Sequence, residues 1–247
     1  MNITTDGDTP PQTDEPSAHP SGVEFLSALQ LSDTFFPTGL YTLSHGFEAF
    51  AQAGLASKEN LEALLQDYLE NVLGPADGVA LSQAHRAAEG RDLGRLSEID
   101  RHLFAMKLVR EAREASRRVG KRILTTAVVL NPDRLLEEYR AAVEAGASPG
   151  TSAVVLGAVA ATFRIARMDA MLIELYTFTA TLLGAAMRLI RLDHEEAQRI
   201  LTRLKPCMVR VVQENQSRDL QDMRAFAPFI DIMGMRHEQA RIRLFIS

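Results

Sequence analysis

The sequence has 247 residues, of which 46% are hydrophobic, so one large domain or two small ones can bury a sizeable core. The formal net charge of −5 argues against nucleic acid as a main partner, and the single cysteine, Cys207, excludes an internal disulfide. Aromatic residues make up only 6%, whereas Ala and Leu are abundant, which favours helix. We therefore expect an all-α protein in a reducing, cytoplasmic compartment.

The first 21 residues differ in composition from the rest of the chain. They are acidic, contain four prolines and offer almost no apolar side chains. Such a segment cannot bury enough apolar surface to offset the entropy of ordering, so residues 1–21 are predicted to be a disordered acidic tail. They also lack the basic and apolar regions of a signal peptide. Residues 22–247 are assigned to one all-helical domain.

From Val23 onward the apolar spacing is helical, and no run with a period of two residues predicts a strand. Proline, glycine and capping residues mark where helices begin and end. About ten helices are predicted, in a single bundle-like array. The clearest span 23–31, 40–53, 57–73, 75–90 and 93–119, and later helices begin after Asp133, at Pro149 and after Asp193.

Residues 170–190 have the length of a membrane span but contain Glu174 and Arg188. An ionised side chain near a bilayer centre costs about 2.5–3.5 kcal/mol on insertion scales. A buried core helix is therefore the preferred interpretation. Its small residues would let another helix approach closely; they are Ala180, Gly184, Ala185 and Ala186.

Residues 32–48, SDTFFPTGLYTLSHGFE, contain the most distinctive turn in the chain. Pro37 and Gly39 interrupt one helical pattern, and a second pattern begins at once. The polar and aromatic side chains that follow are predicted to form an exposed surface of fixed shape; they are Tyr41, Ser44, His45 and Glu48. Such a surface suits recognition better than catalysis, because no complete catalytic set accompanies it.

The motifs of common enzymes and metal sites are missing from the sequence. It has no phosphate-binding G-x-x-x-x-G-K-[ST] loop and no C-x-x-C pair. His237-Glu238 begins like the zinc motif H-E-x-x-H, but Arg241 occupies the position of the second histidine. No catalytic residue, metal site or intrinsic cofactor is therefore predicted. The Arg- and Lys-rich stretch 101–122 is either a solvated helix face or a docking strip for an acidic partner.

The last thirteen residues, MRHEQARIRLFIS, combine charged and apolar side chains. Leu244, Phe245 and Ile246 lie almost at the end of the chain, where residues are normally polar and frayed. Exposed apolar side chains at a terminus are costly unless they are covered. The sequence leaves two possibilities open: the tail packs back on the body, or it inserts into another protein.

Together, the turn and the tail resemble the urease accessory protein UreF family. The family turn reads approximately P-x-G-G-F-x-x-S-x-G-L-E, and the family tail approximately R-H-E-x-x-x-x-R-L-F-x-S. The turn matches at Pro37, Gly39, Tyr41, Ser44, Gly46 and Glu48, and the tail at Arg236, His237, Glu238, Arg243, Leu244, Phe245 and Ser247. The segments LGAVAATF (156–163) and AAMRLIRL (185–192) resemble helices in the middle of the family. The two end motifs are the specific ones.

This resemblance implies a non-enzymatic, all-helical maturation factor. UreF-like proteins form a homodimer, bind UreD (also called UreH), and with it recruit the GTPase UreG, which carries nickel to the urease apoprotein. Nickel is then handled by the complex, and neither nucleic acid nor a membrane is a partner. The turn, including His45, is the candidate GTPase contact, and the tail is the candidate for ordering on UreD.

An alternative from another class remains open at this stage. It is a helical metal-binding protein or enzyme that brings His45, Glu48, His237 and Glu238 into one site.

Overall fold

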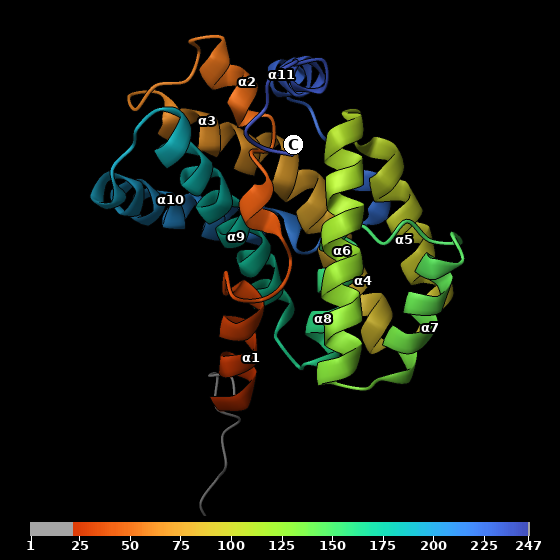
Figure 1. The fold of residues 1–247 in the computed structure, drawn as a ribbon. Helices are drawn as coiled ribbons and strands as arrows, with labels where there is room; N and C mark the ends of the chain where they lie inside the picture. Colours follow the sequence, from red (N-terminus) through yellow and green to blue (C-terminus); the bar gives the residue numbers. More distant parts are fainter. Residues whose placement is uncertain (1–21, 247) are drawn as a thin grey trace, which may run out of the picture.

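The computed structural model describes residues 22–246, so the predictions for residues 1–21 and for Ser247 lie outside the described part of the chain. That part is all-α, as predicted, and contains no strand. Its α-helices are α1 (Gly22–Ser32), α2 (Phe47–Gln52), α3 (Leu61–Tyr68), α4 (Val79–Glu89), α5 (Leu93–Met106), α6 (Arg110–Leu130), α7 (Arg134–Glu144), α8 (Ser152–Thr162), α9 (Arg167–Leu189), α10 (His194–Asn215) and α11 (Pro228–Glu238) (Figure 1). A π-helical segment (Leu69–Gly78) joins α3 to α4, and 3-10 turns cover Leu40–Thr42 and Leu220–Asp222.

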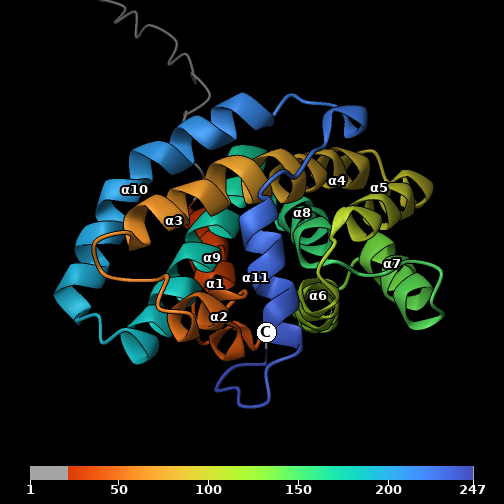
Figure 2. The ribbon, with the colours of Figure 1, turned by 90° about the horizontal axis from the view of Figure 1, so that it is seen from above.

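The centre of the core is α8, in which residues 153–160 are all buried. Figure 2 shows α8 between α4 and α6, and these two helices are its main neighbours. At Gly157 the two helices come so close that an added Cβ would overlap the carbonyl oxygen of Leu81 in α4. This glycine therefore sets the separation of α4 and α8.

The long helix α9 runs through the other half of the core. By length and composition it could cross a membrane, but 56% of its most apolar window is buried inside the protein. The prediction of a core helix is confirmed. Of the small residues predicted to allow close approach, Ala185 and Ala186 are buried, whereas at Gly184 an added Cβ would meet nothing within 4 Å. The close helix contact occurs at Gly157 in α8 instead.

The predicted helix 40–53 is interrupted in the middle. A 3-10 turn covers Leu40–Thr42, and α2 begins only at Phe47. Between them His45 (φ 52°) and Gly46 (φ 81°) both adopt left-handed backbone conformations, which an α-helix cannot continue. An added Cβ on Gly46 would lie 3.3 Å from the Cα of Gly234 in α11, so this turn brings α2 against α11.

Pro75 lies inside a continuous helix rather than at the start of one, and the helix before it begins at Leu61 rather than at Ser57. A proline has no N–H to donate within the helix, and its ring crowds the carbonyl four residues earlier. That carbonyl, on Asn71, accepts a hydrogen bond from the backbone N–H of Phe226 (3.0 Å), and the Pro75 carbonyl accepts one from Arg224 (3.1 Å). The chain segment before α11 thereby donates hydrogen bonds to two carbonyl groups of the irregular π-helical segment.

The predicted helix 93–119 is two helices, α5 and α6, separated by extended residues at Lys107 and Val109. Arg113 donates to the carbonyl oxygens of Lys107 (2.6 Å) and Leu108 (3.0 Å), which satisfies these acceptors at the break. The Lys107 ammonium donates to the buried Asp77 carboxylate at 2.7 Å. The break places the first turn of α6 beside α11, where the chain ends.

Candidate functional site

The structure brings the turn motif and the tail motif together. Helix α11 lies beside α2 and α6, and the residues after it fold back over the turn that precedes α2 (Figures 1 and 2). Phe50 of α2 and Phe229 of α11 make an edge-to-face contact with ring centroids 5.3 Å apart. The two segments are almost 200 residues apart in sequence, and the contact between them forms the candidate site.

Glu48 is the centre of this site. Its side chain is buried, and its carboxylate accepts hydrogen bonds from the backbone N–H groups of Leu244 (2.8 Å) and Phe245 (3.1 Å). Gln52, one helical turn later, donates both to Glu48 (3.2 Å) and to the carbonyl oxygen of Ile242 (3.2 Å). One residue of the turn motif therefore fixes the backbone of the tail.

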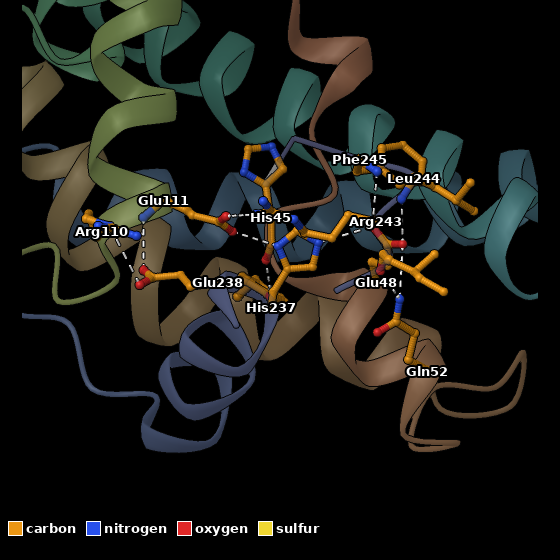
Figure 3. A network of polar contacts seen from close by, with 12 residues as sticks. His45, Glu48, Gln52, Arg110, Glu111, His237, Glu238, Arg243, Leu244 and Phe245 are labelled. Carbon is orange, nitrogen blue, oxygen red and sulfur yellow. Dashed lines mark hydrogen bonds and ion pairs between the residues drawn. The ribbon is translucent and has the colours of Figure 1, made fainter. Parts of the chain in front are cut away.

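His237 links Glu48 to α6. Its Nε2 lies 3.1 Å from Glu48, and its Nδ1 lies 2.6 Å from Glu111 (Figure 3). The imidazole thus bridges a carboxyl group of α2 and a carboxyl group of α6. Glu111 also pairs with the guanidinium of Arg243, and its backbone N–H donates to Glu238 at 3.0 Å. We call Glu48, Glu111, His237 and Arg243 the tail clamp.

The electrostatics of the clamp favour the ionised form of Glu48. Burial by itself raises the pKa of this carboxyl, but the hydrogen bonds from Leu244, His237 and Phe245 outweigh burial and hold the pKa below its ordinary value of 4.5. A buried carboxylate with this many donors is a structural anchor, since each donor would lose a partner if Glu48 were removed.

The tail runs along the surface after α11 and presents two kinds of side chain. Phe245 is buried, and the Arg188 guanidinium lies 5.2 Å from its ring centroid. The Ile246 N–H donates to the carbonyl oxygen of Thr42 at 3.0 Å. Ile242, Leu244 and Ile246 point outward and are 80%, 74% and 55% exposed. Both possibilities raised by the sequence thus apply in part, because the tail packs on the body and still exposes apolar side chains.

The turn motif is not one exposed surface. Pro37 and Tyr41 are exposed, with Tyr41 at 69%, but Ser44 and Glu48 are buried. The expectation failed because it placed all these residues on one regular helix, whereas the left-handed turn at 45–46 rotates Glu48 inward. Gly39 has φ 77° and lies against Arg122 of α6, so it is a backbone requirement of the turn.

His45 lies apart from the clamp. Its ring packs on Phe178 of α9 at a centroid distance of 4.3 Å, and in Figure 3 it points away from His237. It lines a cavity of about 150 Å³ between the π-helical segment, α5, α6 and α11. Burial, reinforced by the nearby Lys107 charge, lowers the pKa of His45 to about 3. His45 is therefore neutral at ordinary pH.

The alternative site built from His45, Glu48, His237 and Glu238 finds limited support. Glu48 and His237 are in contact, and Glu238 approaches them only through the backbone of Glu111. His45 faces the cavity instead. Among residues 22–246, no group of three or more His, Cys, Asp or Glu side chains is arranged so that it could hold a metal ion.

Sequence reasoning missed Glu111. It lies in the first turn of α6, within the basic stretch 101–122, for which the sequence left a solvated helix face and a docking strip open. No local signal in the sequence marks this role, because it depends on the break between α5 and α6, which places the first turn of α6 beside the tail.

Comparison with known proteins gives a consistent result. The model of the UreF family matches residues 55–205. The chain is 31% identical over 236 residues to urease accessory protein UreF 2 of Brucella canis, which covers 95% of this chain and 97% of that protein. It is 34% identical over 225 residues to urease accessory protein UreF of Trichodesmium erythraeum, with 91% and 97% covered. The urease accessory protein UreF of Bacillus sp. (strain TB-90) is 30% identical over 223 residues, with 90% and 98% covered.

Proposed function

Because the chain belongs to the UreF family of non-catalytic urease accessory proteins, we propose that it is a scaffold that recruits the GTPase UreG together with UreD/UreH. The assembled complex delivers nickel to the urease apoprotein. Nickel is cargo of the complex, and this chain supplies no intrinsic cofactor. The proposal includes a homodimer of this chain and a cytoplasmic location.

The observation that carries the proposal is the course of the tail. The clamp holds its backbone through Glu48, and three large apolar side chains face outward beside the turn that contains Tyr41. Ordering of a terminal segment costs conformational entropy. A clamp that orders the tail beforehand therefore reduces the free energy of ordering that binding of a partner must offset. Exposed apolar groups on a rigid backbone are the usual anchors of an interface.

The candidate residues accordingly divide into two roles. Those that contact partners are exposed: Pro37, Tyr41 and Leu244. The buried ones support the surface, and they are Ser44, Glu48, His237 and Phe245. In this proposal the tail faces UreD/UreH and the Pro37–Tyr41 turn faces UreG, while Gly39 sets the backbone of that turn. Arg236 completes the tail surface, and Glu238 and Arg243 support it through their contacts with Glu111.

The proposal is tested by co-expressing the chain with urease, UreD and UreG, then measuring capture of each partner and urease activity. Leu244→Glu changes a side chain that is 74% exposed, so it should leave the fold intact but prevent capture of UreD and lower urease activity. Val129→Glu, at an equally exposed position at the end of α6, is the matched control and should behave as the wild type. Unimpaired capture by the Leu244→Glu chain would contradict the assigned surface.

Full urease activity in cells without this chain, under limiting nickel, would contradict the scaffold function itself.

A further inference from the structure

Three neighbouring cations on α6 have no counter-charge. Arg118, Lys121 and Arg122 are exposed, and in the part of the chain that the structure describes none of them forms an ion pair or a side-chain hydrogen bond. Arg110 and Arg117, on the same helix, each pair with a glutamate instead. We call Arg118, Lys121 and Arg122 the basic strip.

The spacing of the basic strip makes it attractive to anions. Positions three and four apart on a helix are neighbours on its surface, so the three positive charges repel one another. Exposed arginines of α10 avoid such repulsion, because Arg199, Arg203 and Arg210 each pair with a glutamate. An acidic chain segment bound along α6 would relieve the repulsion, and the field of the three cations draws such a segment toward the strip.

Residues 1–21, which we call the acidic segment, have the complementary charge. They contain four acidic residues and neither Lys nor Arg; the acidic residues are Asp6, Asp8, Asp14 and Glu15. Their carboxylates therefore have no Lys or Arg partner within the segment. One exposed ion pair contributes little to binding, but four carboxylates on one tether can face three cations together.

The acidic segment joins the described chain within reach of the basic strip. Gly39, in the turn after α1, lies against Arg122, and Figure 1 shows this turn between α1 and α6. From Gly22 the path along the 11 residues of α1 and through the turn to Gly39 is at most about 40 Å. An extended chain from Gly22 back to Asp8 covers about 50 Å, so the acidic side chains can reach α6.

We propose that the acidic segment binds the basic strip of α6 through reversible ion pairs and thereby limits access to the neighbouring Pro37–Tyr41 turn. The binding is independent of the proposed function, but its consequence rests on that function, because the turn is the surface assigned there to UreG. Ion pairs with exposed cations need no fixed backbone conformation, so a polar, proline-containing segment can form them. The tether supplies an effective concentration on the order of millimolar, so binding within one chain precedes binding between chains.

Carbodiimide cross-linking of the isolated, full-length chain at about 1 µM tests the binding, since this concentration lies far below that supplied by the tether. The reagent joins a carboxyl group to an amine in contact with it, and Lys121 is the one amine of the basic strip. Trypsin leaves the acidic segment in one peptide that ends at Lys58, and fragmentation of this peptide locates the link. The link to Lys121 should form at about 20 mM salt and fall at least about five-fold at about 500 mM, where exposed charges are screened. Lys205, an exposed lysine of α10, should not be joined to the segment.

A pair of substitutions separates attraction by the strip from chance contact with Lys121. Arg118→Gln combined with Arg122→Gln keeps the reactive amine but removes two charges, so the yield at Lys121 should fall by about five-fold or more. Arg199→Gln combined with Arg203→Gln removes the same charge from α10 and is the matched control, which should leave the yield unchanged. Circular dichroism should show equal helical content for both variants, because all four altered side chains are exposed.

Three results would overturn the binding: no link between the acidic segment and Lys121, an equal yield at Lys205, or a yield at Lys121 that loss of Arg118 and Arg122 does not lower. The experiment uses this chain alone, so its outcome is independent of UreD and UreG.

Capture of UreG in the presence of UreD/UreH tests the consequence separately. The full-length chain with Asp6→Asn, Asp8→Asn, Asp14→Asn and Glu15→Gln should capture UreG at a concentration lower by about three-fold or more, because the competent state is no longer partly occupied. Equal capture by this variant and the wild type would overturn the limited access. Failure of both to capture UreG would contradict the proposed function and the consequence that rests on it, whereas the binding is decided by the cross-link alone.

Discussion

At the scale of single residues, Glu48 is the side chain of the turn on which attachment of the tail depends. It joins the backbone of the tail to the imidazole of His237 and to the amide of Gln52, so four donors depend on one carboxylate. Two of these donors are backbone groups that cannot reach another acceptor without moving the tail. The family motif at this position is therefore explained by tail attachment rather than by direct contact with a partner.

Glu48→Gln tests this role. The amide keeps one acceptor oxygen but replaces the other with a donor, which opposes a backbone N–H or His237. We expect the free energy of unfolding to fall by about 1–3 kcal/mol, the usual cost of leaving a buried hydrogen-bonding group unpaired. Urea denaturation measures the loss, and carboxypeptidase digestion should release the tail faster. Glu137→Gln, at an exposed position of α7, is the control and should change neither measurement.

The same carboxylate makes tail attachment dependent on pH. The folded-state pKa of Glu48 lies below 4.5, so its contribution to stability is fully present above about pH 4.5 and is lost as the pH falls through the lower folded value. The backbone amide signals of Leu244 and Phe245 in NMR spectra should shift together below pH 4.5 and stay constant from pH 5 to 7. A midpoint above pH 5 for either amide would contradict the assignment.

Glu174 should have the opposite dependence on pH. Burial in α9 and the nearby Asp77 raise the pKa of Glu174 to about 7, and Lys107 only partly opposes the rise. The native state then binds more protons than the unfolded state between about pH 4.5 and 7, so wild-type stability falls as pH rises through this window. Glu174→Gln should stabilise the protein by about 1–3 kcal/mol at pH 8 and have little effect at pH 4. Urea denaturation at the two pH values measures the difference, and equal effects at both would contradict it.

At the scale of elements, the contact between α4 and α8 depends on a missing side chain. Gly→Ala inside a helix normally stabilises by up to about 1 kcal/mol. At Gly157 the added methyl would overlap the Leu81 carbonyl, so Gly157→Ala should instead destabilise by about 1–3 kcal/mol. Gly184→Ala in α9 is the control and should be neutral or stabilising, since its Cβ would meet open space. Thermal unfolding measures the change in stability of both variants. The midpoint temperature should fall for Gly157→Ala and stay constant or rise for Gly184→Ala.

Most elements could be predicted from the sequence because their ends carry local signals. Asp133 caps α7 by accepting from Leu135 N–H at 2.9 Å, and Asp193 caps α10 by accepting from Glu196 N–H at 2.7 Å. The predicted helix boundaries are wrong where contacts with residues distant in sequence determine the backbone conformation. Pro75 stays inside a helix because Phe226, about 150 residues later, satisfies the Asn71 carbonyl. Neither this bond nor the break at Lys107–Val109 has a signal in the local sequence.

The candidate site was predictable only in part, for the same reason. The turn and the tail were found as motifs, but which side chains face outward depends on the left-handed turn at His45 and Gly46. A histidine at φ 52° is uncommon, and the strain is tolerated where surrounding packing fixes it, here through Phe178 and the Tyr68 hydroxyl that donates to the His45 carbonyl at 2.8 Å. Glu111 was missed because its partners come from the opposite end of the chain.

At the scale of the whole molecule, the two ends of the described chain serve different contacts. Helix α1 lies at the lower edge of Figure 1, whereas α11 and the tail lie at the top. A partner that binds the tail therefore leaves the opposite edge of the molecule free for another contact. Such a separation is what a scaffold requires, because each added partner leaves the previous interface intact.

Deletion of residues 240–247 tests the role of the tail without removing any residue of α11. Deletion from Arg236 would also remove His237, which is fully buried, so loss of function would then be confounded by damage to α11. With residues 240–247 removed, α1 to α11 stay complete, and circular dichroism should show nearly unchanged helical content. The free energy of unfolding should fall modestly, by about 1–3 kcal/mol, because the contacts of Phe245 and Arg243 are lost.

Capture of UreD should then be abolished. Pull-down of UreD by the truncated chain measures this loss. A truncated chain that unfolds outright would show that the tail belongs to the core rather than to an interface. A truncated chain that still captures UreD would place the partner surface elsewhere on the molecule.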